Sequence, residues 1–179
     1  SKSMGTMGTM LFDLDRIGVG LPVADTIDQL PGLLERTLVV QAPPGTGKTT
    51  LVPPALANHT GGKVLVTAPR RVAVRAAARR LAHLDGSRIG ERVGFSVRGE
   101  HHPGELVEFM TPGVLLRRLM ADPELTGISA VAVDEVHERQ LDTDLVLGML
   151  LELAELRDDL AVVAMSATLD VEKFAGLMD

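Results

Sequence analysis

The chain has 179 residues, of which 45% are hydrophobic, and a formal net charge of −6. This length supports one domain with a sizeable core. The absence of Cys excludes disulfides, a thiol nucleophile and a cysteine-based metal site. No apolar run approaches the roughly 18 residues of a membrane span, and no secretory signal pattern is present. We therefore expect a cytoplasmic domain without membrane contact, in which residues 1–10 are an added tag or a disordered start.

Apolar strands alternate with helical segments along the chain. Residues 21–34 have apolar side chains at helical spacing, but Pro31 and Gly32 predict two short helices or a kink. Other segments are apolar along their whole length, which is typical of strands that are covered on both faces of a sheet. The pattern predicts an α/β fold with a mostly parallel sheet, right-handed crossovers and helices on both faces. Strands are expected at residues 37–41, 63–68, 93–97, 106–110, 128–133 and 160–165, and helices at 51–58, 71–84, 114–120, 142–156 and from 171.

A glycine-rich loop stands between the first expected strand and its helix. Residues 41–50 match the pattern G-x-x-x-x-G-K-[ST], except that Ala42 replaces the first Gly. Glycine lacks a Cβ, so backbone N–H groups can approach phosphate oxygens closely. Lys48 supplies a cation for the β- and γ-phosphates, and the Thr49 hydroxyl is a hard ligand for Mg²⁺. The predicted nucleotide-binding residues are Pro44, Gly45, Thr46, Gly47, Lys48, Thr49 and Thr50. A turn that binds no ligand would leave the spacing and the Lys-Thr pair unexplained.

A second acidic motif follows the expected strand at 128–133. In open α/β sheets, ligands bind at the carboxyl ends of the strands, and the loop at 41–50 lies at the same edge. Asp134 is expected to hold Mg²⁺ through water, and Glu135 to orient or activate the attacking water. An acidic helix cap is the alternative reading of this pair. The five apolar residues before Asp134 and the phosphate-binding loop favour the catalytic reading.

Basic residues gather in one part of this acidic chain. The arginines are Arg70, Arg71, Arg75, Arg79, Arg80, Arg88, Arg92 and Arg98, whereas acidic residues concentrate after Glu100. Charges beyond about 8 Å are screened at physiological salt, so a local basic face can still bind phosphate. A solvated helix face with ion pairs explains the pattern equally well. Arg70 and Arg71 begin a helix, where the dipole disfavours cations by about 0.3–1 kcal/mol, which slightly favours a bound anion.

The histidines do not predict a transition-metal site. His137 has no second His at ligand spacing, and His101 and His102 form a pair in a loop-like segment that we expect to be solvated.

Five motifs occur in an order that resembles the DEAH-box superfamily 2 helicases, most closely their bacterial HrpB-type branch. They are residues 42–49, Thr-Ala-Pro-Arg-Arg-Val-Ala (67–73), Thr-Pro-Gly (111–113), Asp-Glu-Val-His-Glu-Arg (134–139) and Ser-Ala-Thr (166–168). The resemblance spans roughly residues 20–179, and the segment Val-Arg-Gly-Glu (97–100) supports the branch. It implies that residues 11–179 form the first RecA-like domain of an ATP-dependent helicase.

The resemblance also implies roles for single residues. Lys48, Asp134 and Glu135 would be catalytic residues, with Thr49 and Asp134 on Mg²⁺ and Arg80 against the adenine face of ATP. The nucleic-acid backbone would contact Arg70, Arg71, Thr111 and Gly113, while His137, Ser166 and Thr168 would couple ATP turnover to strand movement. The strand that ends at Met165 would lie between the first strand and the strand that ends at Val133.

Family members use a second RecA-like domain, which supplies arginine fingers and half of the nucleic-acid groove. An arginine finger accelerates nucleotide hydrolysis by a factor on the order of 10³–10⁵. We therefore expect these residues alone to bind nucleotide but to hydrolyse it slowly or not at all. The expected partner is single-stranded nucleic acid, RNA more than DNA. Four Phe and no Tyr or Trp provide few stacking platforms, so strand binding should depend on phosphate contacts and on salt.

Two other functions fit parts of the sequence. A P-loop small-molecule kinase would need a substrate lid and an acceptor site, for which there is no signal. A non-catalytic nucleotide-binding interaction module would be indicated by loss of Lys48 or Glu135, and both residues are present.

Overall fold

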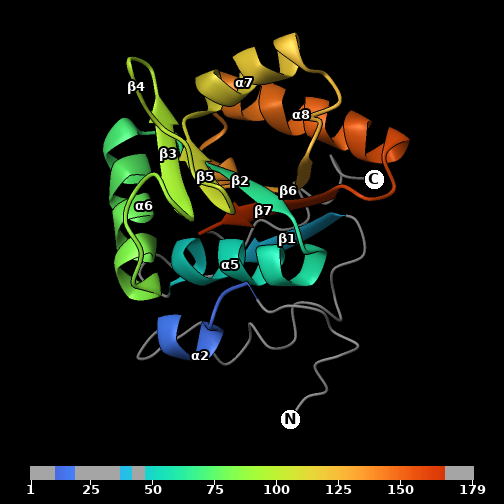
Figure 1. The fold of residues 1–179 in the computed structure, drawn as a ribbon. Helices are drawn as coiled ribbons and strands as arrows, with labels where there is room; N and C mark the ends of the chain where they lie inside the picture. Colours follow the sequence, from blue (N-terminus) through green and yellow to red (C-terminus); the bar gives the residue numbers. More distant parts are fainter. Residues whose placement is uncertain (1–10, 19–36, 42–46, 168–179) are drawn as a thin grey trace.

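The computed structural model describes residues 11–18, 37–41 and 47–167 of the chain (Figure 1). The helices expected at residues 21–34 and from residue 171 lie outside the described residues. None of the described helices has the length and apolar character needed to cross a lipid bilayer.

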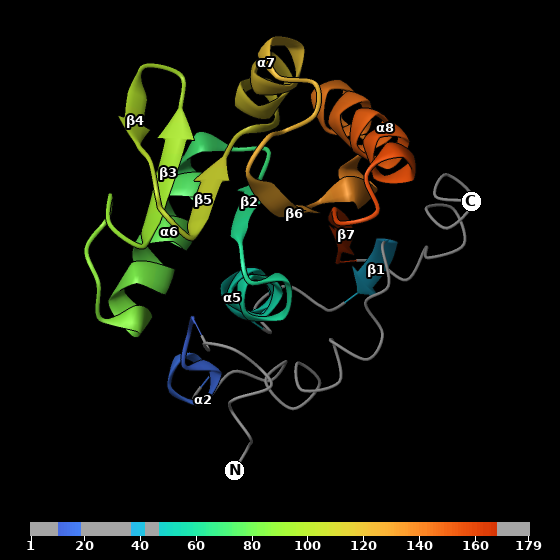
Figure 2. The ribbon, with the colours of Figure 1, turned by 45° about the vertical axis from the view of Figure 1, so that its right-hand side comes forward.

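Seven strands form one sheet in the described part of the chain. The spatial order is β1-β7-β6-β2-β5-β3-β4, and every neighbouring pair is parallel except β3 and β4 (Figure 2). The predicted position of β7 between β1 and β6 is confirmed. The strands are β1 (Thr37–Gln41), β2 (Lys63–Thr67), β3 (Val93–Val97), β4 (Glu100–His102), β5 (Val107–Met110), β6 (Ile128–Val133) and β7 (Ala161–Ser166).

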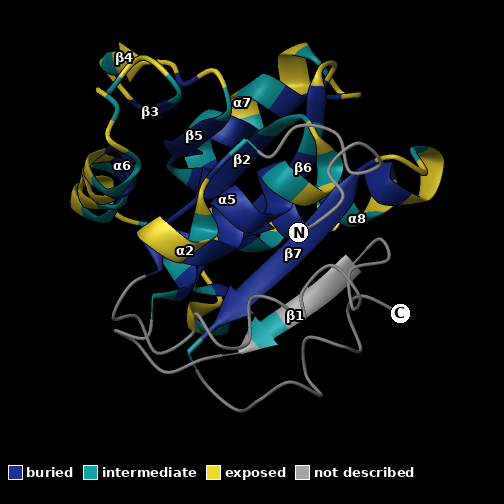
Figure 3. Ribbon diagram, turned by 60° about the horizontal axis from the view of Figure 1, so that its bottom comes forward, coloured by how far each residue is buried: buried dark blue, intermediate teal, exposed yellow. Residues whose placement is uncertain are grey.

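Helices cover both faces of the sheet, as predicted. One face is covered by α5 (Lys48–Thr60) and α6 (Arg71–Asp85), on whose outer side α2 (Leu14–Ile17) packs, and the other face is covered by α7 (Pro112–Ala121) and α8 (Leu141–Leu156) (Figure 1). Successive strand residues point to opposite faces. Val64 and Val66 accordingly pack in the core beside α5 and α6, whereas Leu65 between them packs in the core beside α7 and α8. Figure 3 shows the resulting burial of β7 and α5.

The first helix after the glycine-rich loop contains two consecutive prolines. Helix α5 runs through Pro53 and Pro54, both of which are buried. Each proline lacks the backbone N–H that would bond to the preceding turn, at a typical cost of about 3 kcal/mol in a helix interior. The prediction of a helix here is confirmed, which indicates that packing outweighs the local preference.

Two short elements were not foreseen. His101 and His102 lie in β4, not in a loop, and pair antiparallel with β3 through a two-residue link at Arg98 and Gly99. Gly99 has a φ of 85°, which glycine adopts without strain. Both histidines are exposed, as expected. The other element is α2, which is fixed to α5 because the Asn58 side chain bonds to both the backbone N–H and the carbonyl of Phe12, at 2.8 and 2.9 Å.

A carboxylate is buried in the middle of the sheet. Glu108 of β5 is 4% exposed. Its Oε1 accepts from Lys63 Nζ of β2 at 2.9 Å, and its Oε2 accepts from Ser96 Oγ of β3 at 2.7 Å. Both neighbouring strands therefore contribute a donor, which satisfies the charge where burial would otherwise be costly.

Candidate nucleotide site and adjoining cleft

Four strand ends bring the predicted motifs to one edge of the sheet. The strands β1, β7, β6 and β2 are parallel neighbours, so the residues that follow them lie in a row. The row begins at the end of β1; residues 42–46 of the glycine-rich loop, among them Pro44, Gly45 and Thr46, lie outside the described residues. Residues 166–167, 134–135 and 68–71 follow.

The start of α5 faces the end of β6. Gly47 caps this helix with a φ of 96°, a left-handed conformation that side chains with a Cβ rarely adopt. The Thr49 hydroxyl donates to Asp134 Oδ2 at 3.2 Å, and Lys48 Nζ lies 3.7 Å from Asp134 Oδ1. The side chains of Lys48 and Asp134 are both 8% exposed. Thr50 is buried in the first turn. The structure thus brings together the predicted cation, hydroxyl and carboxylate.

Asp134 is held firmly and is poorly hydrated. Its backbone N–H donates to the carbonyl of Thr67 at 2.9 Å, and its Oδ1 accepts from the backbone N–H of Glu135 at 2.9 Å. Burial raises the pKa of Asp134 above its ordinary value, while Lys48 opposes the shift and Glu135 adds to it. A bound cation would favour the ionised form of this carboxylate.

Glu135 stands at a strained position beside three charged or titratable groups. Its φ of 61° lies in the left-handed region, at the start of the 3₁₀ turn η1 (Val136–Glu138). Glu135 Oε2 is 3.3 Å from Arg70 Nη2, and Oε1 is 3.5 Å from His137 Nε2. Arg70 Nη1 also pairs with Glu138 at 3.2 Å. One carboxylate oxygen of Glu135, one of Glu138 and one ring nitrogen of His137 lie within 4.8 Å of one another.

His137 connects the acidic motif to the end of β7. Its Nδ1 accepts a hydrogen bond from the backbone N–H of Ala167 at 3.2 Å. In the neutral ring, the proton therefore lies on Nε2, the atom that faces Glu135. Ser166 is 1% exposed at the end of β7, and Thr168 lies outside the described residues. His137 thus contacts the segment at 166–168 through Ala167, and the coupling role of these residues stays a prediction.

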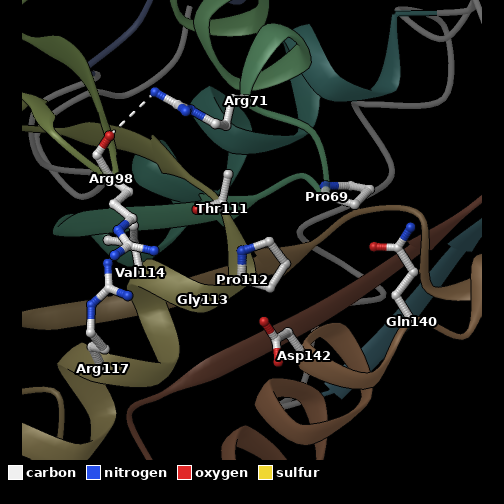
Figure 4. Close-up of a pocket in the computed structure, with 10 residues that line it drawn as sticks. All are labelled: Pro69, Arg71, Arg98, Thr111, Pro112, Gly113, Val114, Arg117, Gln140 and Asp142. Atoms are coloured by element: carbon white, nitrogen blue, oxygen red, sulfur yellow. Dashed lines mark hydrogen bonds between the residues drawn. The ribbon is translucent and has the colours of Figure 1, made fainter.

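A cleft of about 270 Å³ adjoins this site along the same edge (Figure 4). Arg71, Thr111 and Gly113, which were predicted to contact nucleic acid, all line it. Thr111 is the N-cap of α7 and Pro112 its first residue, so the helix begins two residues before the expected start at residue 114. Arg71 Nη2 donates to the carbonyl of Arg98 at 3.3 Å (Figure 4). The remaining lining residues are Pro69, Pro112, Val114, Arg98, Arg117, Gln140 and Asp142.

Two arginines that line the cleft, Arg98 and Arg117, were given no role from the sequence. Arg98 was grouped with the basic residues but given no role, and Arg117 was not considered. Arg117 follows Gly113 by four residues on α7, a spacing that places both on one helix face and could have identified it. Arg70 differs from the other predicted nucleic-acid contacts, because it is not among the residues that line the cleft. Arg80 is exposed on α6, and its contact with adenine stays a prediction.

Comparisons with known proteins agree with this arrangement. The model of the DEAD/DEAH box helicase family matches residues 24–175. The chain is 41% identical to the ATP-dependent RNA helicase HrpB of Escherichia coli K12 over 165 residues, which are 88% of the chain and 20% of HrpB. It is 40% identical to a probable ATP-dependent RNA helicase DHX35 homolog of Caenorhabditis elegans, over 78% of the chain and 20% of that protein.

The fold has a solved counterpart. The crystal structure of the E. coli DEAH/RHA helicase HrpB superposes with a TM-score of 0.81, at 41% identity, over 88% of this chain and 21% of that one. The chain spans about a fifth of the length of these relatives. The family match, the identity and the common RecA-like fold lead to one conclusion: the chain belongs to the DEAD/DEAH box helicase family.

Proposed function

We propose that this chain is the N-terminal, ATP-binding motor domain of an ATP-dependent RNA helicase that acts in the cytoplasm. The observation that carries the proposal is the joint placement of Lys48, Thr49 and Asp134 beside an arginine-lined cleft on one sheet edge. Relatives that are named RNA helicases support RNA over DNA as the substrate.

The residues at the start of α5 fit a magnesium nucleotide. Thr49 and Asp134 offer a hydroxyl and a carboxylate oxygen, the hard ligands that Mg²⁺ takes while it keeps several waters. Lys48 is directed to the same carboxylate and supplies a positive charge for the phosphates. ATP supplies the reactive phosphoanhydride when bound. Glu135 orients the attacking water and accepts its proton, one residue beyond the carboxylate that holds the cation.

The cleft fits the backbone of a single strand. Arg71, Arg98 and Arg117 supply cations, and the N-terminus of the ten-residue helix α7 supplies backbone N–H groups at Thr111 and Gly113. Such contacts position a strand without reading its sequence. A second RecA-like domain of the full-length protein completes the groove and the hydrolytic site, and these residues alone are weakly active or inactive.

Calorimetric titration with MgADP tests the nucleotide site. We expect Lys48→Ala to weaken binding by about 10- to 100-fold, the value of one or two charge-assisted contacts. Thr49→Ser keeps the hydroxyl and should bind as the wild type does, whereas the isosteric Thr49→Val should lose the magnesium-dependent part. Equal binding by wild type, Lys48→Ala and Thr49→Val would contradict the proposed site.

A further inference from the structure

Arg70 stands between the nucleotide site and the cleft but contacts only the former. Its neighbours Pro69 and Arg71 both line the cleft, whereas Arg70 directs its guanidinium to Glu135 and Glu138. It is the N-cap residue of α6, yet its side chain makes no capping bond. A guanidinium has only N–H donors and cannot accept from the free N–H groups at the start of a helix, so this side chain acts through its carboxylate contacts.

We infer that Arg70 is a positioning residue that makes Glu135 respond to a bound strand. Without a strand, the guanidinium of Arg70 holds the Glu135 carboxylate. A backbone phosphate of single-stranded RNA in the cleft competes for Arg70 and releases Glu135 to orient the attacking water. The inference rests on the proposed function, because it takes Glu135 as the base and the cleft as the strand site.

The pairing of Glu135 explains why its release matters. Arg70 contacts Oε2 and His137 lies near Oε1, so both carboxylate oxygens have a charged or titratable partner. The left-handed backbone of Glu135 fixes where this side chain begins. Removing the Arg70 contact frees Oε2 and leaves the 3.5 Å contact between Oε1 and His137, so the carboxylate is held at one oxygen and can turn about its side-chain bonds. If ATP hydrolysis depends on a bound strand, its general base must be able to change position when the strand binds.

The exposure of Arg70 makes exchange of partners feasible. Its side chain is 56% exposed, and those of Glu135 and Glu138 are 21% and 29% exposed. An exposed ion pair shifts an equilibrium by only about 1.4- to fivefold. A phosphate oxygen presents the same charge as a carboxylate and accepts the same N–H donors. A strand that is held by Arg71, Arg98 and Arg117 therefore needs only a small gain to capture Arg70 as well.

Strand binding by this chain tests the competition for Arg70. The probe is a 5′-fluorescein-labelled uridine decamer, measured by anisotropy at low salt, with wild type, Glu138→Gln, Arg70→Ala and the double variant. Glu138→Gln removes one competing carboxylate, so we expect binding to tighten by about 1.4- to fivefold. In the Arg70→Ala background, the same change should have no effect. Circular dichroism checks that each variant is folded.

A matched control removes the general effect of charge. Asp159→Asn deletes one negative charge and one exposed ion pair, to Arg157, before the start of β7 and thus at the opposite end of the parallel strands. It should leave decamer binding unchanged. Tightening by Glu138→Gln that persists without Arg70, or equal tightening by Asp159→Asn, would overturn the inference.

ATP hydrolysis by the full-length protein tests the release of Glu135. Arg70→Gln should raise kcat without RNA by about 1.4- to fivefold and reduce the further stimulation by RNA, with KM for ATP unchanged. Arg70→Lys keeps the charge and should restore most of the wild-type behaviour. A residue of purely structural importance would lower kcat with and without RNA alike. An unchanged or lower kcat without RNA in Arg70→Gln would therefore overturn the inference.

The two proposals fail in different ways. If the wild type binds neither MgADP nor the decamer, the proposed function and the inference fall together. If it binds both, but the Arg70 and Glu138 variants behave independently, the inference alone is wrong.

Discussion

Two ion-paired groups at the same sheet edge differ in their access to water. Lys48 and Asp134 are both 8% exposed and 3.7 Å apart, whereas Arg70 is 56% exposed and divides itself between two carboxylates. Charges in a low-dielectric interior interact strongly, and charges in water interact weakly. The comparison indicates that the groups for nucleotide binding are set in advance, while the contact that restrains Glu135 can be exchanged.

The buried pair should show the larger effect on folding. Lys48→Met leaves Asp134 buried without its cation, and we expect the free energy of unfolding to fall by about 1–3 kcal/mol. Urea denaturation without nucleotide at neutral pH measures this change. The double variant Lys48→Met/Asp134→Asn removes both charges and should recover part of the loss. If the single variant is as stable as the wild type, the pair is not a buried interaction in solution.

The burial of Asp134 should also make the stability of the protein depend on pH. Because burial raises the pKa of Asp134, the folded protein keeps this proton over a range in which the unfolded chain has lost it. Stability from this group is therefore present below the unfolded pKa, near 3.9, and is lost as the pH rises to the folded value, by about 1.4 kcal/mol for each pKa unit.

Urea denaturation of wild type and Asp134→Asn between pH 4 and 8 measures this contribution as a difference. Glu100 and Asp159, whose pKa values Arg75 and Arg157 lower by hydrogen bonding, titrate in both proteins and cancel. Leaving Lys48 unpaired in Asp134→Asn lowers the free energy of unfolding by the same amount at every pH, so it does not change how this free energy depends on pH. A difference that rises with pH would contradict the raised pKa.

The exposed pair should contribute least to folding. We expect Arg70→Gln to change the free energy of unfolding by less than about 1 kcal/mol, because solvent screens both contacts of this half-exposed side chain. The same urea series measures it. A loss of unfolding free energy comparable to that of Lys48→Met would show that Arg70 is a structural residue. The Arg70 contacts would then not be weaker than the buried Lys48–Asp134 pair.

Much of the fold could be predicted because the strands are uniformly apolar and the breaks between them are clear. Residues 37–41, 93–97 and 128–133 form strands with the predicted limits. The order of β1, β7 and β6 followed from the family resemblance, since periodicity alone does not fix which strands are neighbours. Arg71, Thr111 and Gly113, which were expected to contact the nucleic-acid backbone, line one cleft in the structure. Their contacts with nucleic acid remain predictions, as does the cytoplasmic location.

The contacts of Arg70 could not be predicted from sequence. Arg70 and Glu135 follow strands β2 and β6, which are far apart in the chain and become neighbours only in the sheet. The helix-dipole argument called for an anion beside Arg70, and in this structure Glu135 and Glu138 supply it. Sequence analysis had assigned that anion to a nucleic-acid phosphate. It also missed β4, whose three residues are exposed or half-exposed and lack an apolar pattern.

The buried Glu108 has a consequence for how the sheet assembles. A shift of β5 by one residue would turn Glu108 toward the opposite face, where Val64, Val93 and Phe95 of the neighbouring strands are part of an apolar core. The carboxylate would there lose both Lys63 and Ser96 and stand uncompensated. Since Lys63 and Ser96 come from the two strands that flank β5, the single charged residue selects both neighbours and their alignment at once. Pairings of β5 that are shifted by one residue are therefore destabilised by an unpaired buried carboxylate.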